Sequence, residues 1–296
     1  MRVACVGEVM VELSLSGDDQ ARLGVAGDTF NTAVYLKREA PSVTVDYVSR
    51  IGRDAFSDRI SQAIQSAGIG TGHLSRDPKR APGLYAITTD DQGERSFTYW
   101  RGQSAARVMF EAGFDALTGF DVIYLSAITL AILSPDQRDG LRAWLGKFRE
   151  RGGRVAFDSN YRPNLWEGQQ VAHECVAGFW GLTDIALPSV DDEMALFGDT
   201  SEDQVVNRLH TLGVRFGALK RGAEGPRALG PNQVDQPYAP APVVRDSTAA
   251  GDSFNGGFLA AHLQGADLAT ALAAGHACAA WVVQHPGAIA PEQERG

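Results

Sequence analysis

The chain has 296 residues, and its 27 lysines and arginines against 36 aspartates and glutamates give a formal net charge of −9. With 44% hydrophobic and 21% charged residues, its composition is that of an ordinary folded protein and excludes wholesale disorder. The acidic balance argues against non-specific nucleic-acid binding, which needs a basic surface, but a local basic pocket for an anionic small substrate remains compatible with it.

The first predicted elements in chain order are strands with one apolar face. Residues 9–15 alternate between apolar and polar side chains, which predicts a half-buried strand. Gly27 and Asp28 then precede a predicted helix. Residues 84–99 alternate on both sides of a polar turn at 90–93, which predicts a β-hairpin. These strands fit a small antiparallel flap apart from the main sheet, or equally an extension of that sheet's edge.

The middle of the chain predicts repeated strand–helix–strand units. Short apolar runs that predict strands lie at residues 122–125, 154–157, 185–187 and 214–219. Helical apolar spacing follows Ser134-Pro135, an N-cap with proline at the first helical position. A second helix follows Ser201, which forms a capping box with Gln204. Such alternation predicts an open, mostly parallel α/β sheet with its ligand site at the carboxyl ends of the strands.

The most informative stretch runs from Asp246 to Phe258. A predicted strand ending near Val244 leads into small residues and then into a helix that stops by Gly265. Small residues at a helix start let backbone N–H groups approach an anion, and the helix dipole favours negative charge there. Asp252, in the first turn, either complements the dipole or takes a proton from a hydroxyl that attacks a bound phosphoryl group.

Motifs of several other function classes are absent from the sequence. It contains no GxxxxGK[ST] loop, no HRD/DFG pair, no HExxH and no GxSxG. The glycines of residues 68–72 miss the GxGxxG spacing, which counts against a nucleotide-binding oxidoreductase. A non-catalytic sugar sensor is the other alternative, and an intact Asp252 counts against it.

The string Asp246-Ser-Thr-Ala-Ala-Gly-Asp252 resembles the D-T-x-x-A-G-D signature of the ribokinase-like (phosphofructokinase-B) sugar kinases, with Ser247 replacing threonine. The resemblance covers essentially the whole chain, from a first strand at residues 3–8 to Pro286-Gly287-Ala288. Within that family the chain is most similar to kinases of 2-keto-3-deoxygluconate, through residues 27–31, 82–85, 99–101, 124–134 and 157–163.

The family resemblance implies one ribokinase-like α/β domain over residues 1–296. Its central, mostly parallel sheet would be flanked by helices, and a small antiparallel β lid would be formed by about residues 9–27 and 82–108. Exposed lid edges tend to pair with another chain, so we expect a homodimer through residues 84–99.

The implied activity is ATP-dependent phosphorylation of 2-keto-3-deoxygluconate at its terminal hydroxyl, with Asp252 as the general base. The backbone N–H groups of Ala249, Ala250 and Gly251 would hold the moving phosphoryl group. A kinase of fructose, of a related keto-sugar acid or of a nucleoside is the alternative. Whether the 4-epimer is also a substrate depends on the surroundings of one hydroxyl.

The substrate side of the expected site comes from the helix start near residue 27 and from the hairpin. Its predicted residues are Gly27, Asp28, Asn31, Tyr85, Tyr99, Trp100, Arg101, Arg162 and Asp252. Tyr99 and Arg101 are two residues apart and therefore share one face of a strand. A guanidinium beside phenols suits a carboxylate, whereas a neutral sugar would leave Arg101 unpaired.

The nucleotide side is implied by the resemblance alone. Its expected residues are Asn160, Tyr161, Arg162, Ser189, Lys220, Arg221, Gly222, Ala223, Gly225, Ala249, Ala250, Gly251 and His276. Arg162 would neutralise charge in the transition state. The loop at 220–225 resembles K-x-G-x-x-G, and His276, on a predicted helix over 267–283, either lines the adenine pocket or packs in the core.

Mg²⁺ is the expected metal. Ser189-Val190-Asp191-Asp192 stands where the family usually has Asn-x-x-Glu, so Asp192 would act through water, with Asp191 or Glu193 as substitutes. A monovalent cation near Asp246 and Ala288 is a further implication of the family.

The cysteines and apolar segments bear on location. The three cysteines lie far apart without a CxxC pair, which favours reduced thiols in the cytosol. An acidic residue at position 8 is too early for a signal peptide, and the apolar stretch 122–133 is shorter than the ~20 residues that cross a membrane. We expect a cytoplasmic protein with no nucleic-acid or membrane partner.

Overall fold

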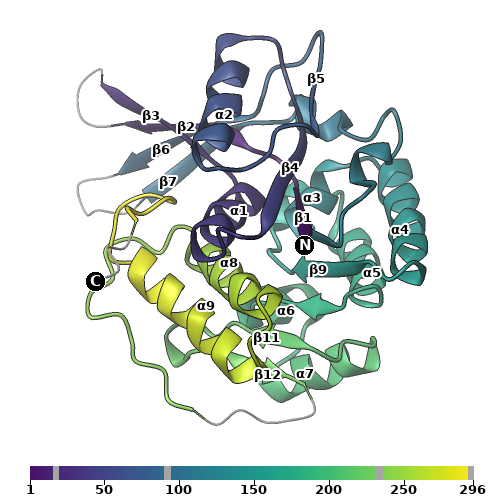
Figure 1. Cartoon of the computed structure of the whole chain (residues 1–296), viewed down its shortest axis with the longest axis vertical. Coiled ribbons are helices and arrows are strands. Elements are labelled where there is room, and N and C mark those ends of the chain that lie inside the picture. Colours follow the sequence, from purple (N-terminus) through teal and green to yellow (C-terminus); the bar gives the residue numbers. More distant parts are fainter. Residues whose placement is uncertain (16–19, 90–94, 231–235, 293–296) are drawn as a thin grey trace.

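The computed structural model describes residues 1–15, 20–89, 95–230 and 236–292. These residues form an α/β body from which a separate, smaller sheet projects on one side (Figure 1). The predicted fold class is therefore confirmed, and the alternative in which the early strands extend the edge of the main sheet is wrong.

The body sheet has the strand order β12-β11-β10-β9-β8-β1-β4-β5. Its strands are β1 (Arg2–Val6), β4 (Thr44–Ile51), β5 (Leu74–Arg76), β8 (Val122–Ser126), β9 (Arg154–Asp158), β10 (Ile185–Ala186), β11 (Gly217–Leu219) and β12 (Arg227–Leu229). Neighbouring strands run parallel except for the hairpin of β11 and β12. In the register of β8 with β9, Ser126 lies opposite Asp158, so both side chains sit at the carboxyl edge.

Helices cover both faces of this sheet. They are α1 (Asp28–Glu39), α2 (Ala55–Ser66), α3 (Ala127–Ile132), α4 (Pro135–Glu150), α5 (Gln169–Trp180), α6 (Val190–Phe197), α7 (Glu202–Thr211), α8 (Ala250–Leu263) and α9 (Leu268–Val282). Alternate residues of the buried strands belong to two cores. One core packs against α3 to α7, and the other packs against α1, α2, α8 and α9.

The helix starts follow the predicted capping chemistry. Ser134 accepts a hydrogen bond from the Gln137 N–H at the start of α4, and Ser201 does the same for Gln204 at α7. In contrast, the strand expected near Val244 is wrong. The segment 236–249 contains no strand, and Val244 is exposed, because the nearby prolines at 240 and 242 lack the N–H groups that a strand needs.

The lid is a four-stranded sheet with the order β3-β2-β6-β7. Its strands are β2 (Met10–Leu15), β3 (Ala21–Ala26), β6 (Leu84–Thr89) and β7 (Arg95–Trp100). The hairpin of β6 and β7 is antiparallel as expected, and β2 also pairs antiparallel with β3. Strands β2 and β6 pair in parallel, so the lid sheet is mixed and not antiparallel throughout. The predicted turn at 90–93 lies outside the described residues. In the part of the chain that is described, no helix is long and apolar enough to span a membrane.

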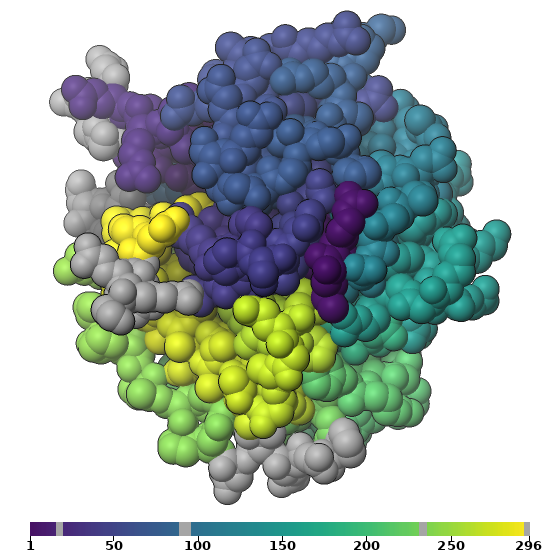
Figure 2. All heavy atoms as spheres, viewed as in Figure 1, coloured from purple at the N-terminus to yellow at the C-terminus, as the bar shows by residue number. Residues whose placement is uncertain are grey.

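Helix α8 packs closely against α1 and α9 on the face seen in Figures 1 and 2. A Cβ atom on Gly256 would lie 2.5 Å from the Cβ of Tyr35 and 3.0 Å from the carbonyl oxygen of Thr32. This glycine therefore sets the distance between α8 and α1, and both helices contribute residues to the cavity described below.

We predict that Gly256→Ala separates α8 from α1. Overpacking of this kind costs about 1–3 kcal/mol, and the melting temperature should fall by roughly 2–10 °C. Gly146→Ala in α4 is the matched control, because no atom lies within 4 Å of the added carbon. The control should melt at or above the wild-type temperature in differential scanning calorimetry. Equal melting of the two variants would contradict the proposed close contact.

Candidate active site

A cavity of about 880 Å³ lies between the carboxyl edge of the body sheet, the start of α8 and the lid. The residues that line it include Asp192 and all the predicted catalytic, sugar and nucleotide residues except two, Trp100 and Tyr161. The fold thus gathers side chains from positions 8 to 288 around one space.

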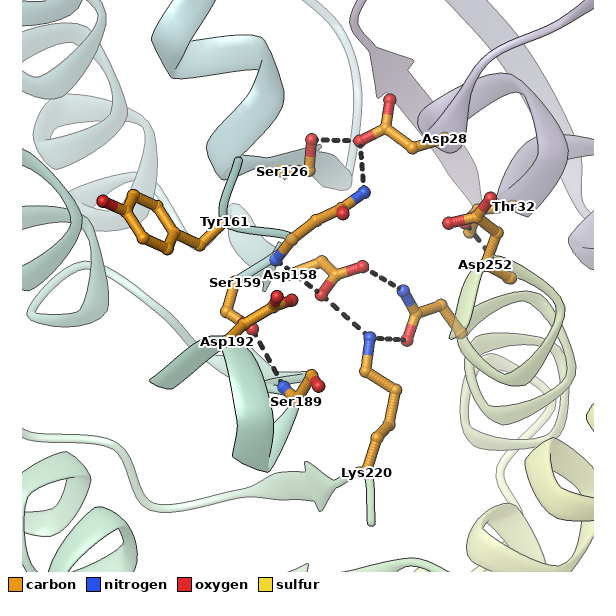
Figure 3. A network of polar contacts seen from close by, with 12 residues as sticks. Asp28, Thr32, Ser126, Asp158, Ser159, Tyr161, Ser189, Asp192, Lys220 and Asp252 are labelled. Atoms are coloured by element: carbon orange, nitrogen blue, oxygen red, sulfur yellow. Dashed lines mark hydrogen bonds and ion pairs between the residues drawn. The ribbon is translucent and has the colours of Figure 1, made fainter. Parts of the chain in front are cut away.

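Both exceptions are corrections with a simple geometric cause. Trp100 is 59% exposed, because it alternates with Tyr99 and Arg101 and projects from the opposite face of β7. Tyr161 is buried in the core that packs on α3 to α7, and in Figure 3 its ring points away from Lys220 and Asp252. Its neighbours Asn160 and Arg162 do line the cavity.

The start of α8 has an unusual backbone. Ala249 is the N-cap and has φ 61°, the left-handed region, which no other non-glycine residue among those described adopts. Such a conformation is costly for an L-residue and persists where the surroundings enforce it. The N–H of Ala250 donates to the Ser247 carbonyl at 3.1 Å, so it is not a free phosphate donor as expected. The first-turn N–H groups of Gly251 and Asp252 follow it, in positions that lack intrahelical acceptors.

Asp252 lies in the first turn of α8 and faces α1. Asn31 Nδ2 donates to its Oδ2 at 2.8 Å, and Thr32 Oγ1 donates to its backbone oxygen at 3.1 Å. The desolvated surroundings of the carboxyl, followed by the negative charge of Asp28, raise the pKa of Asp252 to about 7. Desolvation also raises the pKa of Asp28, whose Oδ2 accepts hydrogen bonds from Ser126 and, at 3.0 Å, from Asn160.

A second polar cluster lies beside the first and was not foreseen from the sequence, apart from Lys220. Lys220 Nζ is 2.8 Å from Asp158 Oδ1 and 3.2 Å from Asn255 Oδ1, and Asn255 Nδ2 donates to Asp158 Oδ2 at 2.7 Å (Figure 3). Asp158 ends β9 and Asn255 lies one turn beyond Asp252. Their positions at a strand end and in the signature helix were the available sequence signals.

Arg101 already has a partner within the protein. It is 7% exposed, and its Nε and Nη2 both contact Oε2 of Glu8, with Nε at 2.8 Å. The premise that a neutral substrate leaves Arg101 unpaired is therefore wrong, because Glu8 pairs with it inside the protein. Glu8 itself, just after β1, was missed by the sequence reasoning and lines the same cavity.

The aromatic face of the lid forms the wall opposite the body. Tyr85, Phe97 and Tyr99 lie with neighbouring ring centroids 5.6–6.3 Å apart and line the cavity. The Tyr85 hydroxyl donates to the buried Glu12, so its ring rather than its hydroxyl faces a ligand.

The predicted nucleotide residues form the other end of the cavity. Lining residues here are Ser189, Asp191, Asp192, Lys220, Arg221, Gly222, Ala223, Gly225 and His276. Residues 220–225 span the turn between β11 and β12, with the short 3-10 helix η4 at Gly222–Glu224. His276 Nε2 lies 2.7 Å from the Ala239 carbonyl oxygen, so this histidine is held by the loop as well as lining the cavity.

The acidic residues near Ser189 differ in their availability. Asp192 lines the cavity and pairs with Arg162 at 3.2 Å. Burial raises the pKa of Asp192 above its usual range, although the Arg162 guanidinium opposes this shift. Glu193 is fully buried and bound to Arg208 and Trp180, so it cannot substitute as a metal ligand. Across residues 1–15, 20–89, 95–230 and 236–292, no group of three potential ligands is arranged to hold a metal ion. This donor set fits Mg²⁺ held chiefly by phosphates and water, with one carboxylate.

Three comparisons place the chain among known proteins. The model of the family described as pfkB family carbohydrate kinase matches residues 1–295. A 2-dehydro-3-deoxygluconokinase from Escherichia coli (strain K12) is 41% identical over 303 residues, covering 99% of this chain and 98% of that enzyme.

Solved structures agree with this assignment. Aminoimidazole riboside kinase from Salmonella enterica, complexed with aminoimidazole riboside and an ATP analog, has a TM-score of 0.85 and 25% identity, covering 97% of this chain and 95% of that one. Fructokinase from Vibrio cholerae O395, in its fructose, ADP and calcium ion bound form, has a TM-score of 0.84 and 25% identity, covering 97% and 94%. The sequence motifs, the fold and the near-complete family match together show that the chain belongs to the pfkB family of carbohydrate kinases.

Proposed function

We propose that this kinase transfers the γ-phosphoryl group of ATP to the terminal hydroxyl of 2-keto-3-deoxygluconate, giving the 6-phosphate and ADP. The near full-length similarity to the Escherichia coli 2-dehydro-3-deoxygluconokinase carries this proposal. The cavity supports it, because it joins a candidate base, a helix start suited to phosphate and a lid arginine suited to a carboxylate. The proposed site of action is the cytoplasm.

In the proposed reaction Asp252 is the general base. The sugar hydroxyl oxygen forms a bond to the γ-phosphorus, the bond from that phosphorus to the bridging oxygen breaks, and ADP leaves with the electron pair. The hydroxyl proton passes to the Asp252 carboxylate. The N–H groups of Gly251 and Asp252 and the dipole of α8 stabilise the negative charge that spreads over the moving group.

ATP would lie along the loop 220–225 with its phosphates toward α8 and its base toward His276. Asn160, Arg162 and Ser189 would contact the phosphates. Mg²⁺, held by the phosphates and through water by Asp192, would supply charge neutralisation on the phosphates. The proposed site for a monovalent cation lies near Asp246 and Ala288. Asp246 Oδ1 also accepts a hydrogen bond from the Thr248 N–H at 3.0 Å, and the Ala288 carbonyl oxygen accepts one from the Tyr35 hydroxyl at 2.7 Å.

A base with a pKa near 7 predicts a defined pH dependence. Asp252 accepts a proton only as a carboxylate, so kcat/KM should fall about tenfold per unit as the pH drops below about 7. Asp28→Asn removes the neighbouring negative charge, lowers the pKa of Asp252 and should move the acid limb to lower pH. Asp252→Asn should lower kcat by ~10²–10⁴-fold while ATP binding is kept. An acid limb that stays in place in Asp28→Asn would contradict the coupling, and normal turnover in Asp252→Asn would contradict the base.

Recognition of the proposed sugar acid requires that Arg101 bind the carboxylate of the substrate while it is also paired with Glu8. Two of the guanidinium nitrogens face Glu8, and Nη1 is the remaining nitrogen for a ligand. A directed hydrogen bond, rather than net positive charge, would then select the substrate, because Glu8 neutralises the arginine.

ATP-consumption assays on the sugar acid, on its carboxylate-free analogue and on fructose test whether Arg101 selects the carboxylate. Arg101→Gln should lose about 10- to 150-fold in kcat/KM on the acid, equivalent to roughly 1.5–3 kcal/mol, and little on the neutral analogue. The double variant Glu8→Gln/Arg101→Gln is the control, because it leaves no buried unpaired carboxylate. Equal losses on acid and neutral substrates in both variants would favour the fructokinase alternative.

The lid also supports a proposed homodimer through residues 84–99. Strand β7 is an edge of the lid sheet, and Trp100 is exposed on its outer face. We predict a dimer in sedimentation equilibrium at micromolar concentration, and a shift toward monomer in Trp100→Glu. Ser96→Glu adds a carboxylate on the same strand without removing an apolar ring, and it should shift the equilibrium less. A wild-type monomer under these conditions would rule the dimer out.

A further inference from the structure

We propose that Lys220 contacts the phosphoryl group in transfer, and that Asp158 and Asn255 are positioning residues that hold its ammonium there. The proposal rests on the proposed phosphoryl transfer at the start of α8 and deepens it. It narrows the role of Lys220, which the motifs placed only among the nucleotide residues, and it gives a task to Asp158 and Asn255, which the motifs left without one.

The ammonium of Lys220 stands next to the start of α8. A Cβ atom on Gly251 would lie 3.6 Å from Lys220 Nζ, so the ammonium is within contact distance of the first turn. The side chain of Lys220 is 11% exposed and lines the cavity. A cation beside the positive end of a helix dipole is unfavourable on its own, and the two together form a site for an anion.

The hydrogen bonds of the ammonium leave one donor for that anion. An ammonium has three N–H donors. Asp158 Oδ1 accepts one at 2.8 Å and Asn255 Oδ1 accepts another at 3.2 Å. Asp158 is 2% exposed and Asn255 is fully buried, so neither is free to follow the lysine elsewhere. Within the described part of the chain, this leaves the third donor for a phosphoryl oxygen.

The orientation of Asn255 is fixed by its other contacts. Its Nδ2 donates to Asp158 Oδ2 at 2.7 Å and to the Tyr124 hydroxyl at 3.1 Å, so its Oδ1 must face Lys220. The Tyr124 hydroxyl accepts from Asn255 and can therefore donate to Thr32 Oγ1, 3.0 Å away.

The chain of hydrogen bonds ends at the backbone of the proposed base. Thr32 Oγ1 donates to the backbone oxygen of Asp252 at 3.1 Å. One buried network thus fixes both the ammonium on the phosphate side and the first helical turn that carries Asp252, whose carboxylate is held by Asn31. As the bond from the sugar oxygen to phosphorus forms and the bond to ADP breaks, Lys220 stabilises the negative oxygens while Asp252 receives the proton.

The first test measures nucleotide binding and is independent of the sugar. Lys220→Met keeps the length of the side chain and removes its charge. Its preference for a non-hydrolysable ATP analogue over ADP should fall toward one, with ADP affinity within about threefold of wild type, and kcat should fall ~10²–10³-fold. An unchanged preference would overturn the contact between Lys220 and the terminal phosphate.

The second test separates positioning from a purely structural role. Lys220→Ala should regain at least tenfold in kcat with added methylammonium or ethylammonium, because the amine occupies the site that Asp158 and Asn255 form. Lys220→Ala/Asp158→Asn and Lys220→Ala/Asn255→Leu should not be rescued. Equal rescue in all three variants would overturn the positioning roles.

Controls keep the outcome interpretable. Asp184→Asn removes a carboxylate paired with Arg149 outside the cavity, and it should leave kcat and nucleotide preference unchanged. Amines should not rescue Asp252→Asn.

A replacement variant covers the case in which Asn255→Leu fails to fold, as judged by melting. Asn255→Asp, of equal size, then takes its place, and amine rescue of Lys220→Ala/Asn255→Asp would also overturn the proposal. If no sugar acid is phosphorylated but Lys220→Met loses the nucleotide preference, the proposed substrate fails and this inference stands.

Discussion

The site is built from charged side chains that are largely removed from water, and each of them needs a partner supplied by the fold. Asp158 has the ammonium of Lys220, and Glu8 has the guanidinium of Arg101. The carboxylate of Asp252 accepts a hydrogen bond from the neutral amide of Asn31 and stands near the negative Asp28. Desolvation, followed by the charge of Asp28, raises the pKa of Asp252 to about 7, which suits this carboxylate to the proposed role of accepting a proton near neutral pH.

The same constraint ties distant packing to the chemistry. Asp252 and Asn255 are three residues apart, so they lie on one face of α8 and move together. That face reaches Asn31 and Thr32 because α8 approaches α1 closely at Gly256. A small displacement of one helix would therefore alter the proposed base, Asp252, and the lysine cluster at once.

The lid follows the same pattern with a different consequence. Tyr85 is bound to Glu12, and Arg101 is bound to Glu8, so the lid presents aromatic rings and one neutralised guanidinium to the cavity. Under the proposed function, selection of a sugar acid by such a lid would depend on the direction of a hydrogen bond more than on attraction between net charges. A directed hydrogen bond of this kind does not need a net positive site, which suits a protein whose overall charge is negative.

The sequence by itself determined the local features: the alternating strands and helices, the caps at Ser134 and Ser201, and the small residues before Asp252. These depend on hydrogen bonds and side-chain periodicity within a few residues, which a linear pattern records. It also pointed to the cavity, since all but two of the predicted catalytic, sugar and nucleotide residues line it. The tertiary structure decided the partners. Nothing near Arg101 in the sequence indicates Glu8, and nothing near Lys220 indicates Asp158 or Asn255. Such pairs form because the strand order brings the ends of β1, β9 and β11 to one edge, and strand order follows from packing across the whole chain.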